Sequence, residues 1–177
     1  MNFLLATALF ATPLLGFAAT SLPACHETAT APLSFRSEQS RDTIEVTIRG
    51  APCHAAMLSV RITSDAGKVL YSYDAPFKMH VAIHWEDPEL PKRAAEFASR
   101  IAAQDEKETT SDLPPWQLEN DYYEEHFNLI KVSKEQYEQL RSQERPIFTH
   151  PTHYEQWQSV IYEPETGLAR ILLEGGL

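Results

Sequence analysis

The first 24 residues constrain the chain most, because they contain no Asp, Glu, Lys, Arg or His. Their centre, residues 3–19, is an apolar run interrupted by Pro13 and Gly16. Such N-terminal runs are typical of secretory signal peptides, although no Lys or Arg precedes this one. A membrane-spanning helix needs about 20 mainly apolar residues and is weakened by an interior proline, so a retained anchor is less favoured. We therefore expect residues 1–24 to be a signal peptide and the mature protein to be periplasmic or secreted.

Two interpretations of the cleavage site remain open. Small residues at 16–18 and at 19–21 fit an ordinary signal peptidase. Residues 22–25, Leu-Pro-Ala-Cys, resemble a lipoprotein box, although a proline just before the small residue is unusual there. In the second interpretation a lipid on Cys25 anchors the domain in the cell envelope, whereas ordinary cleavage releases it.

The chain has two cysteines, Cys25 and Cys53. In an oxidising compartment an even count predicts a disulfide, which here closes a loop of about 29 residues. A lipid on Cys25 would leave Cys53 unpaired. The pairs Cys25-His26 and Cys53-His54 suggest four metal ligands as an alternative, but a metal site requires reduced thiols and is less favoured outside the cytoplasm.

Residues 25–177 are enough for one compact domain and too few for two comfortable ones. This part carries the whole net charge of −10. Residues 86–125 hold twelve acidic and four basic side chains, a balance of −8, and include an acidic connecting segment at about 105–125. This charge argues against nucleic acid and an anionic membrane surface as partners and favours a cationic protein or ligand.

Alternation of apolar and polar residues predicts strands with one buried face. Two hairpins stand out because their strands flank turn-forming residues, including Gly67 in the first and Gly167 in the second. The predicted strands cover residues 42–49, 58–63, 68–73, 79–85, 127–132, 157–162 and 168–174.

Two helices are predicted between these strands. Residues 91–104 carry an apolar stripe at helical spacing, and Ser133 with Gln136 has the spacing of a capping box that opens a second helix before Pro146. Strands in runs at both ends of the chain favour an α+β fold. We expect a largely antiparallel sheet with two helices packed on one face and one disulfide.

Catalytic and cofactor motifs are missing from the sequence, so we predict no catalytic residue and no cofactor. The six glycines do not form a dinucleotide fingerprint, a phosphate loop or a nucleophile elbow. The remaining candidates are metal ligands: His150 and His153 in a predicted loop, with Glu155 and His126 as possible additions. Surface or partly buried histidines are more common than ligands at such positions, so the metal site stays the alternative hypothesis.

Residues 112–127 combine aromatic and acidic side chains, and we call them the acidic aromatic segment. Beside five acidic residues and a Pro-Pro pair stand Trp116, Tyr122, Tyr123 and Phe127. Rigid aromatic side chains suit a recognition loop, but they also suit a lid that completes the core. The sequence thus predicts an exported, non-enzymatic protein that binds a basic partner, as an inhibitor would. The alternatives are a metal-dependent hydrolytic envelope protein and a purely structural role.

Overall fold

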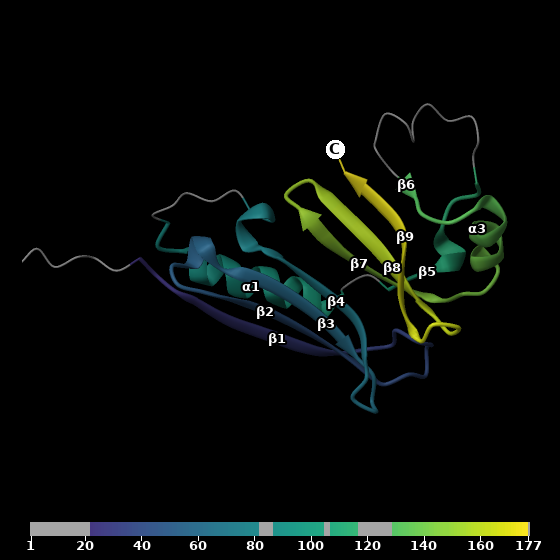
Figure 1. Cartoon of the computed structure of the whole chain (residues 1–177), viewed down its shortest axis with the longest axis horizontal. Coiled ribbons are helices and arrows are strands. Elements are labelled where there is room, and N and C mark those ends of the chain that lie inside the picture. Colours follow the sequence, from purple (N-terminus) through teal and green to yellow (C-terminus); the bar gives the residue numbers. More distant parts are fainter. Residues whose placement is uncertain (1–21, 82–86, 105–106, 117–128, 177) are drawn as a thin grey trace, which may run out of the picture.

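The computed structural model describes residues 22–81, 87–104, 107–116 and 129–176 (Figure 1). Within these residues the chain forms two antiparallel sheets, with strand orders β1-β2-β3-β4 (sheet A) and β5-β7-β8-β9-β6 (sheet B). The predicted α+β class, the antiparallel pairing and the disulfide are confirmed.

The elements are β1 (Cys25–Leu33), β2 (Asp42–Gly50), η1 (Cys53–Ala55), β3 (Met57–Thr63), β4 (Val69–Pro76), η2 (Phe77–Met79), α1 (Leu90–Ala103), β5 (Glu108–Thr109), η3 (Thr110–Asp112), β6 (Leu129–Ile130), α3 (Lys134–Arg141), β7 (Pro146–His153), β8 (Gln156–Glu163) and β9 (Leu168–Gly176).

Sheet A buries one face, as its period-two pattern requires. Ile44, Val46 and Ile48 of β2 are fully buried and pair with the equally buried Ile62, Val60 and Leu58 of β3. The residues between them, such as Glu45, point to the exposed face.

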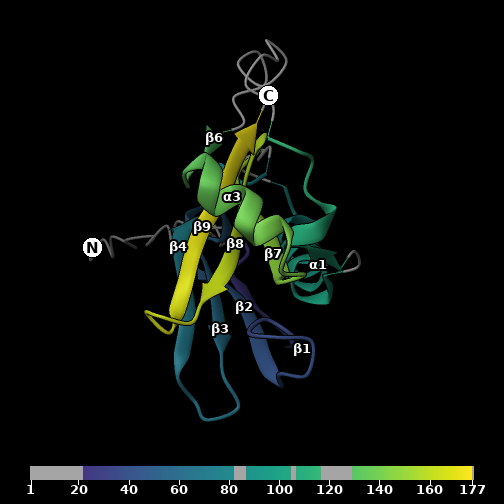
Figure 2. The same cartoon turned by 90° about the vertical axis from the view of Figure 1, so that its right-hand side faces the viewer.

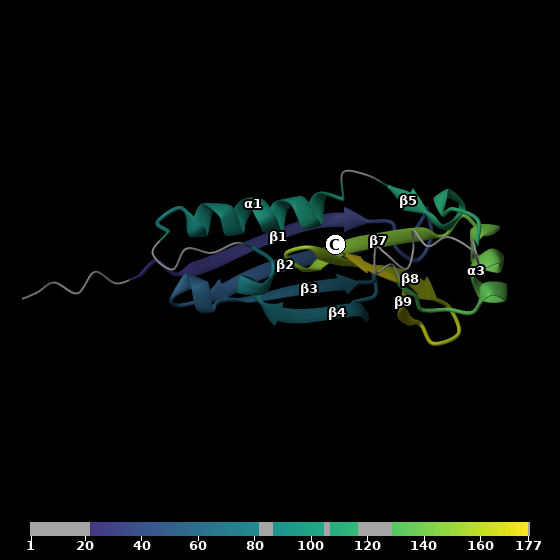
Figure 3. The ribbon, with the colours of Figure 1, turned by 90° about the horizontal axis from the view of Figure 1, so that it is seen from above.

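Helix α1 covers the buried face of sheet A over β1 and β2 (Figure 3). Small residues on both sides allow a close approach, because Ala94 and Ala98 of the helix are buried beside the partly buried Ala29 and Ala31 of β1. Larger rings fill the end of this layer, where Phe97 meets Phe77 edge-on with ring centroids 5.6 Å apart.

Sheet B packs beside α1 on the same core of sheet A (Figure 2). Phe148 of β7 and Val160 of β8 are fully buried in this core. The contact is aromatic at its centre, because the ring of Tyr71 on β4 meets Phe148 at a centroid distance of 6.1 Å.

The other face of sheet B carries a second, smaller core under α3. Ile147, Ile161 and Leu172 of the sheet pack here with Tyr137 of α3. The chain therefore forms two sheets with one helix on each, where the sequence predicted one sheet with both helices on one face. The reason lies in β8, whose consecutive Val160 and Ile161 are both buried and therefore need apolar layers on both faces.

The hairpin turns and helix starts follow the predicted local chemistry. Gly67 and Gly167 adopt φ values of 80° and 67°, a region that favours glycine. The Ser133 side chain accepts a hydrogen bond from the Gln136 backbone N–H, and the Gln136 side-chain oxygen accepts one from the Ser133 backbone N–H, which completes the capping box.

The strand predicted over residues 79–85 is wrong for its described part. Residues Phe77–Met79 form a short 3-10 helix and His80 lies in the following turn, while residues 82–86 lie outside the described chain. The backbone N–H of Phe77 donates to the Ala56 carbonyl at 2.8 Å, and the fully buried Phe77 ring holds the chain in this turn.

Residues 1–21 of the predicted signal peptide lie outside the described chain, so the export prediction stays a prediction. No helix of the described ranges combines the length and the apolar character needed to cross a membrane.

Candidate functional site

A groove of about 360 Å³ lies on the face of sheet B that also carries the second core. Its lining comes from β5, η3, β7, β8 and β9, and from the first residues of the acidic aromatic segment. We call it the acidic groove; its lining residues are Glu108, Thr109, Asp112, Leu113, Pro114, Ile147, Thr149, Trp157, Ser159 and Leu173.

The charge of the acidic groove is negative. The described residues that line it include the exposed carboxylates of Glu108 and Asp112 and no Lys, Arg or His. The backbone N–H and the hydroxyl of Thr109 donate to the Asp112 carboxylate at 2.8 and 2.9 Å. These hydrogen bonds lower the pKa of Asp112, so this carboxylate is ionised at neutral pH.

The floor of the acidic groove offers an aromatic ring and two hydroxyls. Trp157 is half-buried, and across the strands the hydroxyls of Thr149 and Ser159 lie 2.7 Å apart. A groove lined by a tryptophan and by carboxylates suits ammonium and guanidinium groups, because the ring face and the negative charges both attract a cation. The groove therefore has the chemistry of a site for lysine or arginine side chains.

The acidic aromatic segment starts at this groove and is held on α3. The Tyr137 hydroxyl donates to the Pro114 carbonyl at 2.9 Å, and the Trp116 backbone N–H donates to Glu138 Oε1 at 2.8 Å. The Trp116 ring packs edge-on against Tyr137 with centroids 5.5 Å apart and belongs to the second core. Trp116 is half-buried rather than exposed. For this residue the structure therefore favours the alternative in which the aromatic side chains complete the core.

The chain returns to sheet B after this segment through β6. Ile130 of β6 pairs with Leu173 of β9, which also lines the acidic groove. The residues between Trp116 and β6 include Glu119, Asp121, Glu124 and Glu125 and no Lys or Arg. The predicted contact residues Tyr122, Tyr123 and Phe127 lie outside the described chain, as does His126.

His150, the first of the metal candidates, is only 1% exposed and lies between the sheets. Its Nδ1 donates to the Pro151 carbonyl at 2.9 Å, and its Nε2 accepts from the Tyr71 hydroxyl at 2.6 Å and from Gln158 Nε2 at 3.0 Å. Both ring nitrogens are therefore engaged, and the Gln158 amide also donates to Tyr71. Burial lowers the pKa of His150 to about 4, so the ring is neutral at physiological pH.

His153 and Glu155 are exposed and do not join His150. Within the described ranges, no three His, Cys, Asp or Glu side chains are grouped so that they could hold a metal ion. Because His126 lies outside these ranges, the metal hypothesis stays a prediction.

His80 is a second buried histidine and lies in the turn after η2. It is 4% exposed, with Tyr73 and Phe97 at ring-centroid distances of 6.0 and 5.8 Å. Neither of its ring nitrogens has a hydrogen-bond partner among the described residues. Burial, together with the nearby His150 and His153, lowers the pKa of His80 to about 4.

Cys25 of β1 and Cys53 of η1 form the predicted disulfide and are both buried. A sulfur in a disulfide can neither carry a lipid nor ligate a metal as a thiolate, so this structure excludes both alternatives while the bond is present.

The sequence did not identify the acidic groove. Its residues come from five elements that meet only when sheet B forms, and Trp157 has no distinctive sequence neighbourhood. The available signal was the acidic connecting segment at about 105–125, which contains both Glu108 and Asp112. Comparisons with protein-family models, curated proteins and solved structures find no match to this chain.

Proposed function

We propose that the protein is an exported, non-enzymatic binding protein that takes up a cationic partner at the acidic groove. The observation that carries this proposal is the groove itself, whose lining includes the carboxylates of Glu108 and Asp112 and the ring of Trp157. Lysine and arginine side chains of a basic protein can contact these carboxylates and this ring there.

The surrounding charge supports the same partner. The acidic aromatic segment begins in the groove wall, and the chain rejoins sheet B at Ile130 of β6, which pairs with Leu173. The sequence between these two points contains four carboxylates, at residues 119–125. An excess of one charge attracts an oppositely charged protein during encounter and makes binding sensitive to salt. The partner is thus a basic protein, and inhibition of a basic envelope enzyme is one form this function takes.

The test is binding of an alternating lysine–alanine peptide of about ten residues with acetylated and amidated ends, compared with its glutamate–alanine counterpart. We expect only the cationic peptide to bind, and its affinity to fall at least about tenfold between about 50 and 300 mM salt. Binding that is equal for both peptides or unchanged by salt would contradict the proposal.

Single substitutions locate the site. Trp157→Leu keeps an apolar side chain but removes the ring, and Glu108→Gln removes one charge, so each should weaken binding about threefold. Glu165→Gln removes an exposed charge from the distant β8–β9 turn and is the matched control. If the control weakens binding as much as Glu108→Gln, the peptide responds to net charge and the acidic groove is not the site.

A further inference from the structure

A second and larger groove, of about 640 Å³, lies on the other side of β5. It is bounded by the end of β1, the loop from β1 to β2, the C-terminal end of α1, β5 and the start of β7. We call it the junction groove; its lining residues are Pro32, Leu33, Ser34, Glu38, Ser40, Arg41, Asp42, Thr43, Ala103, Gln104, Lys107, Glu108, Thr109, Pro146 and Ile147.

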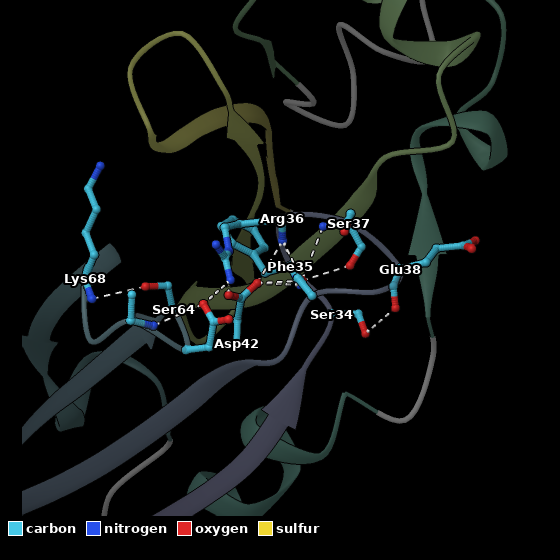
Figure 4. A network of polar contacts seen from close by, with 11 residues as sticks. Ser34, Phe35, Arg36, Ser37, Glu38, Asp42, Ser64 and Lys68 are labelled. Carbon is cyan, nitrogen blue, oxygen red and sulfur yellow. Dashed lines mark hydrogen bonds and ion pairs between the residues drawn. The ribbon is translucent and has the colours of Figure 1, made fainter.

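One wall of the junction groove is held by a buried carboxylate. The Asp42 side chain is fully buried and accepts from Arg36 Nε and the Ser40 hydroxyl, both at 2.7 Å, and from the Arg36 backbone N–H at 3.0 Å (Figure 4). Burial alone would raise the pKa of Asp42, but these hydrogen bonds lower it below its usual range. The loop is therefore tied at its base before any ligand arrives.

The opposite wall is tied as well. Gln104, at the end of α1, donates from its side-chain amide to the Ile101 carbonyl at 2.9 Å and to the Thr149 carbonyl at 3.3 Å. This bridge joins the helix end to β7. The junction groove thus lies between two walls that are each fixed by hydrogen bonds.

The lining of the junction groove carries charges of both signs. Glu38 and Arg41 lie on the β1–β2 loop, and Lys107 and Glu108 lie at β5. None of these four side chains forms an ion pair with another residue of the described chain. Figure 4 shows the Glu38 side chain pointing away from the Asp42 network, so it does not serve to hold the loop.

Apolar side chains lie between these charges. Leu33, Ala103, Pro146 and Ile147 line the groove and offer an aliphatic surface. A volume of this size lies within the usual range for small-molecule sites, about 300 to 1,000 Å³. A matching ligand has an ammonium group, a carboxylate and an apolar body.

We propose that the junction groove binds a short apolar peptide with both ends free. Arg41 and Lys107 contact its carboxylate, Glu38 and Glu108 contact its ammonium group, and the aliphatic surface covers its side chains. This proposal goes beyond the cationic partner at the acidic groove and does not depend on it, because the two sites share a wall at β5 but differ in ligand chemistry.

The test is titration calorimetry, which measures the affinity of the tetrapeptide Ala-Leu-Leu-Ala for the intact, disulfide-bonded chain. We expect the free peptide to bind at submillimolar concentration, and acetylation or amidation each to weaken binding at least about fivefold. Arg41→Gln should weaken binding of the free peptide and reduce the effect of amidation, and Glu38→Gln should reduce the effect of acetylation, because Lys107 and Glu108 each keep one contact. Lys78→Gln, an exposed cation outside the groove, is the matched control and should change nothing.

The proposal is overturned if the free peptide fails to bind at about 5 mM, or if blocked and free peptides bind equally. A second outcome also overturns the proposal: the protein does not bind the peptide but sediments with phosphatidylethanolamine vesicles. The same charges would then recognise a lipid headgroup. Failure of this proposal is distinguishable from failure of the proposed function, because the lysine–alanine peptide has blocked ends and its affinity depends on Trp157.

Discussion

Replacement of His80 by phenylalanine should flatten the dependence of folding stability on pH. In the folded chain His80 and His150 are neutral down to about pH 4, since burial lowers the pKa of both to about 4. In the unfolded chain they take up protons near the ordinary histidine pKa of 6.5. The unfolded state therefore binds more protons as the pH falls, and stability is full above about pH 6.5 and decreases down to about pH 4.

The size of the effect follows from these two pKa values. For one histidine with a pKa of about 4 when folded and 6.5 when unfolded, linkage predicts a loss of about 2 kcal/mol between pH 7 and pH 5. The wild-type protein should thus lose about 4 kcal/mol over this range, and His80→Phe about 2 kcal/mol. Phenylalanine keeps the contacts with Tyr73 and Phe97 and removes two buried nitrogens that lack a described partner, so stability at pH 7 should not decrease.

The assay is urea unfolding at both pH values, followed by circular dichroism with the disulfide intact. Leu90→Ala, a core substitution without a titratable group, is the control and should lower the free energy of unfolding about equally at pH 7 and pH 5. If wild type and His80→Phe show the same difference between the two pH values, His80 does not stay neutral in the folded state and the reasoning is refuted.

Two further predictions concern the residues that hold the N-terminal half together. Replacement of Cys25 and Cys53 by alanine should lower the free energy of unfolding by about 3 to 4 kcal/mol, because the disulfide closes a loop with a sequence separation of 28. A smaller decrease, measured by denaturant unfolding, would contradict this loop-closure argument. Asp42→Ala should lower the free energy of unfolding by about 2 to 3 kcal/mol, because Arg36 loses the hydrogen bonds that its Nε and its backbone N–H donate to the carboxylate. An unchanged thermal midpoint would show that water replaces the carboxylate.

Strong local patterns predicted most of the fold. The alternation around Ile44, the stripe around Ala94 and the Ser133 capping box all led to the observed elements, because each side chain's role is set within a few residues. Strand β1 was not predicted, since its inward residues include the small Ala29 and Ala31, which fit under α1 but give little hydrophobic contrast.

Strand β7 was also missed, because Pro146 and Pro151 indicated a helix end and a loop. The short β5 pairs only with residues 146 and 147 of β7, and the rest of that edge of β7 has no neighbouring strand among the described residues. A proline at position 151 therefore removes no ladder hydrogen bond on that edge. This error placed His150 in a loop as a candidate ligand, whereas the strand turns it inward against Tyr71. Both grooves depend on how β5 meets β7, which is a long-range pairing that no local pattern encodes.

The disulfide has a consequence for contacts between copies of the chain. Strand β1 forms one edge of sheet A, and Cys25 at its first residue is bonded to Cys53 beyond β2. A nine-residue outer strand is the element most easily donated to a neighbouring molecule. The covalent link to η1 keeps this strand with its own sheet, so the oxidised chain is protected from strand exchange that the reduced chain is free to undergo.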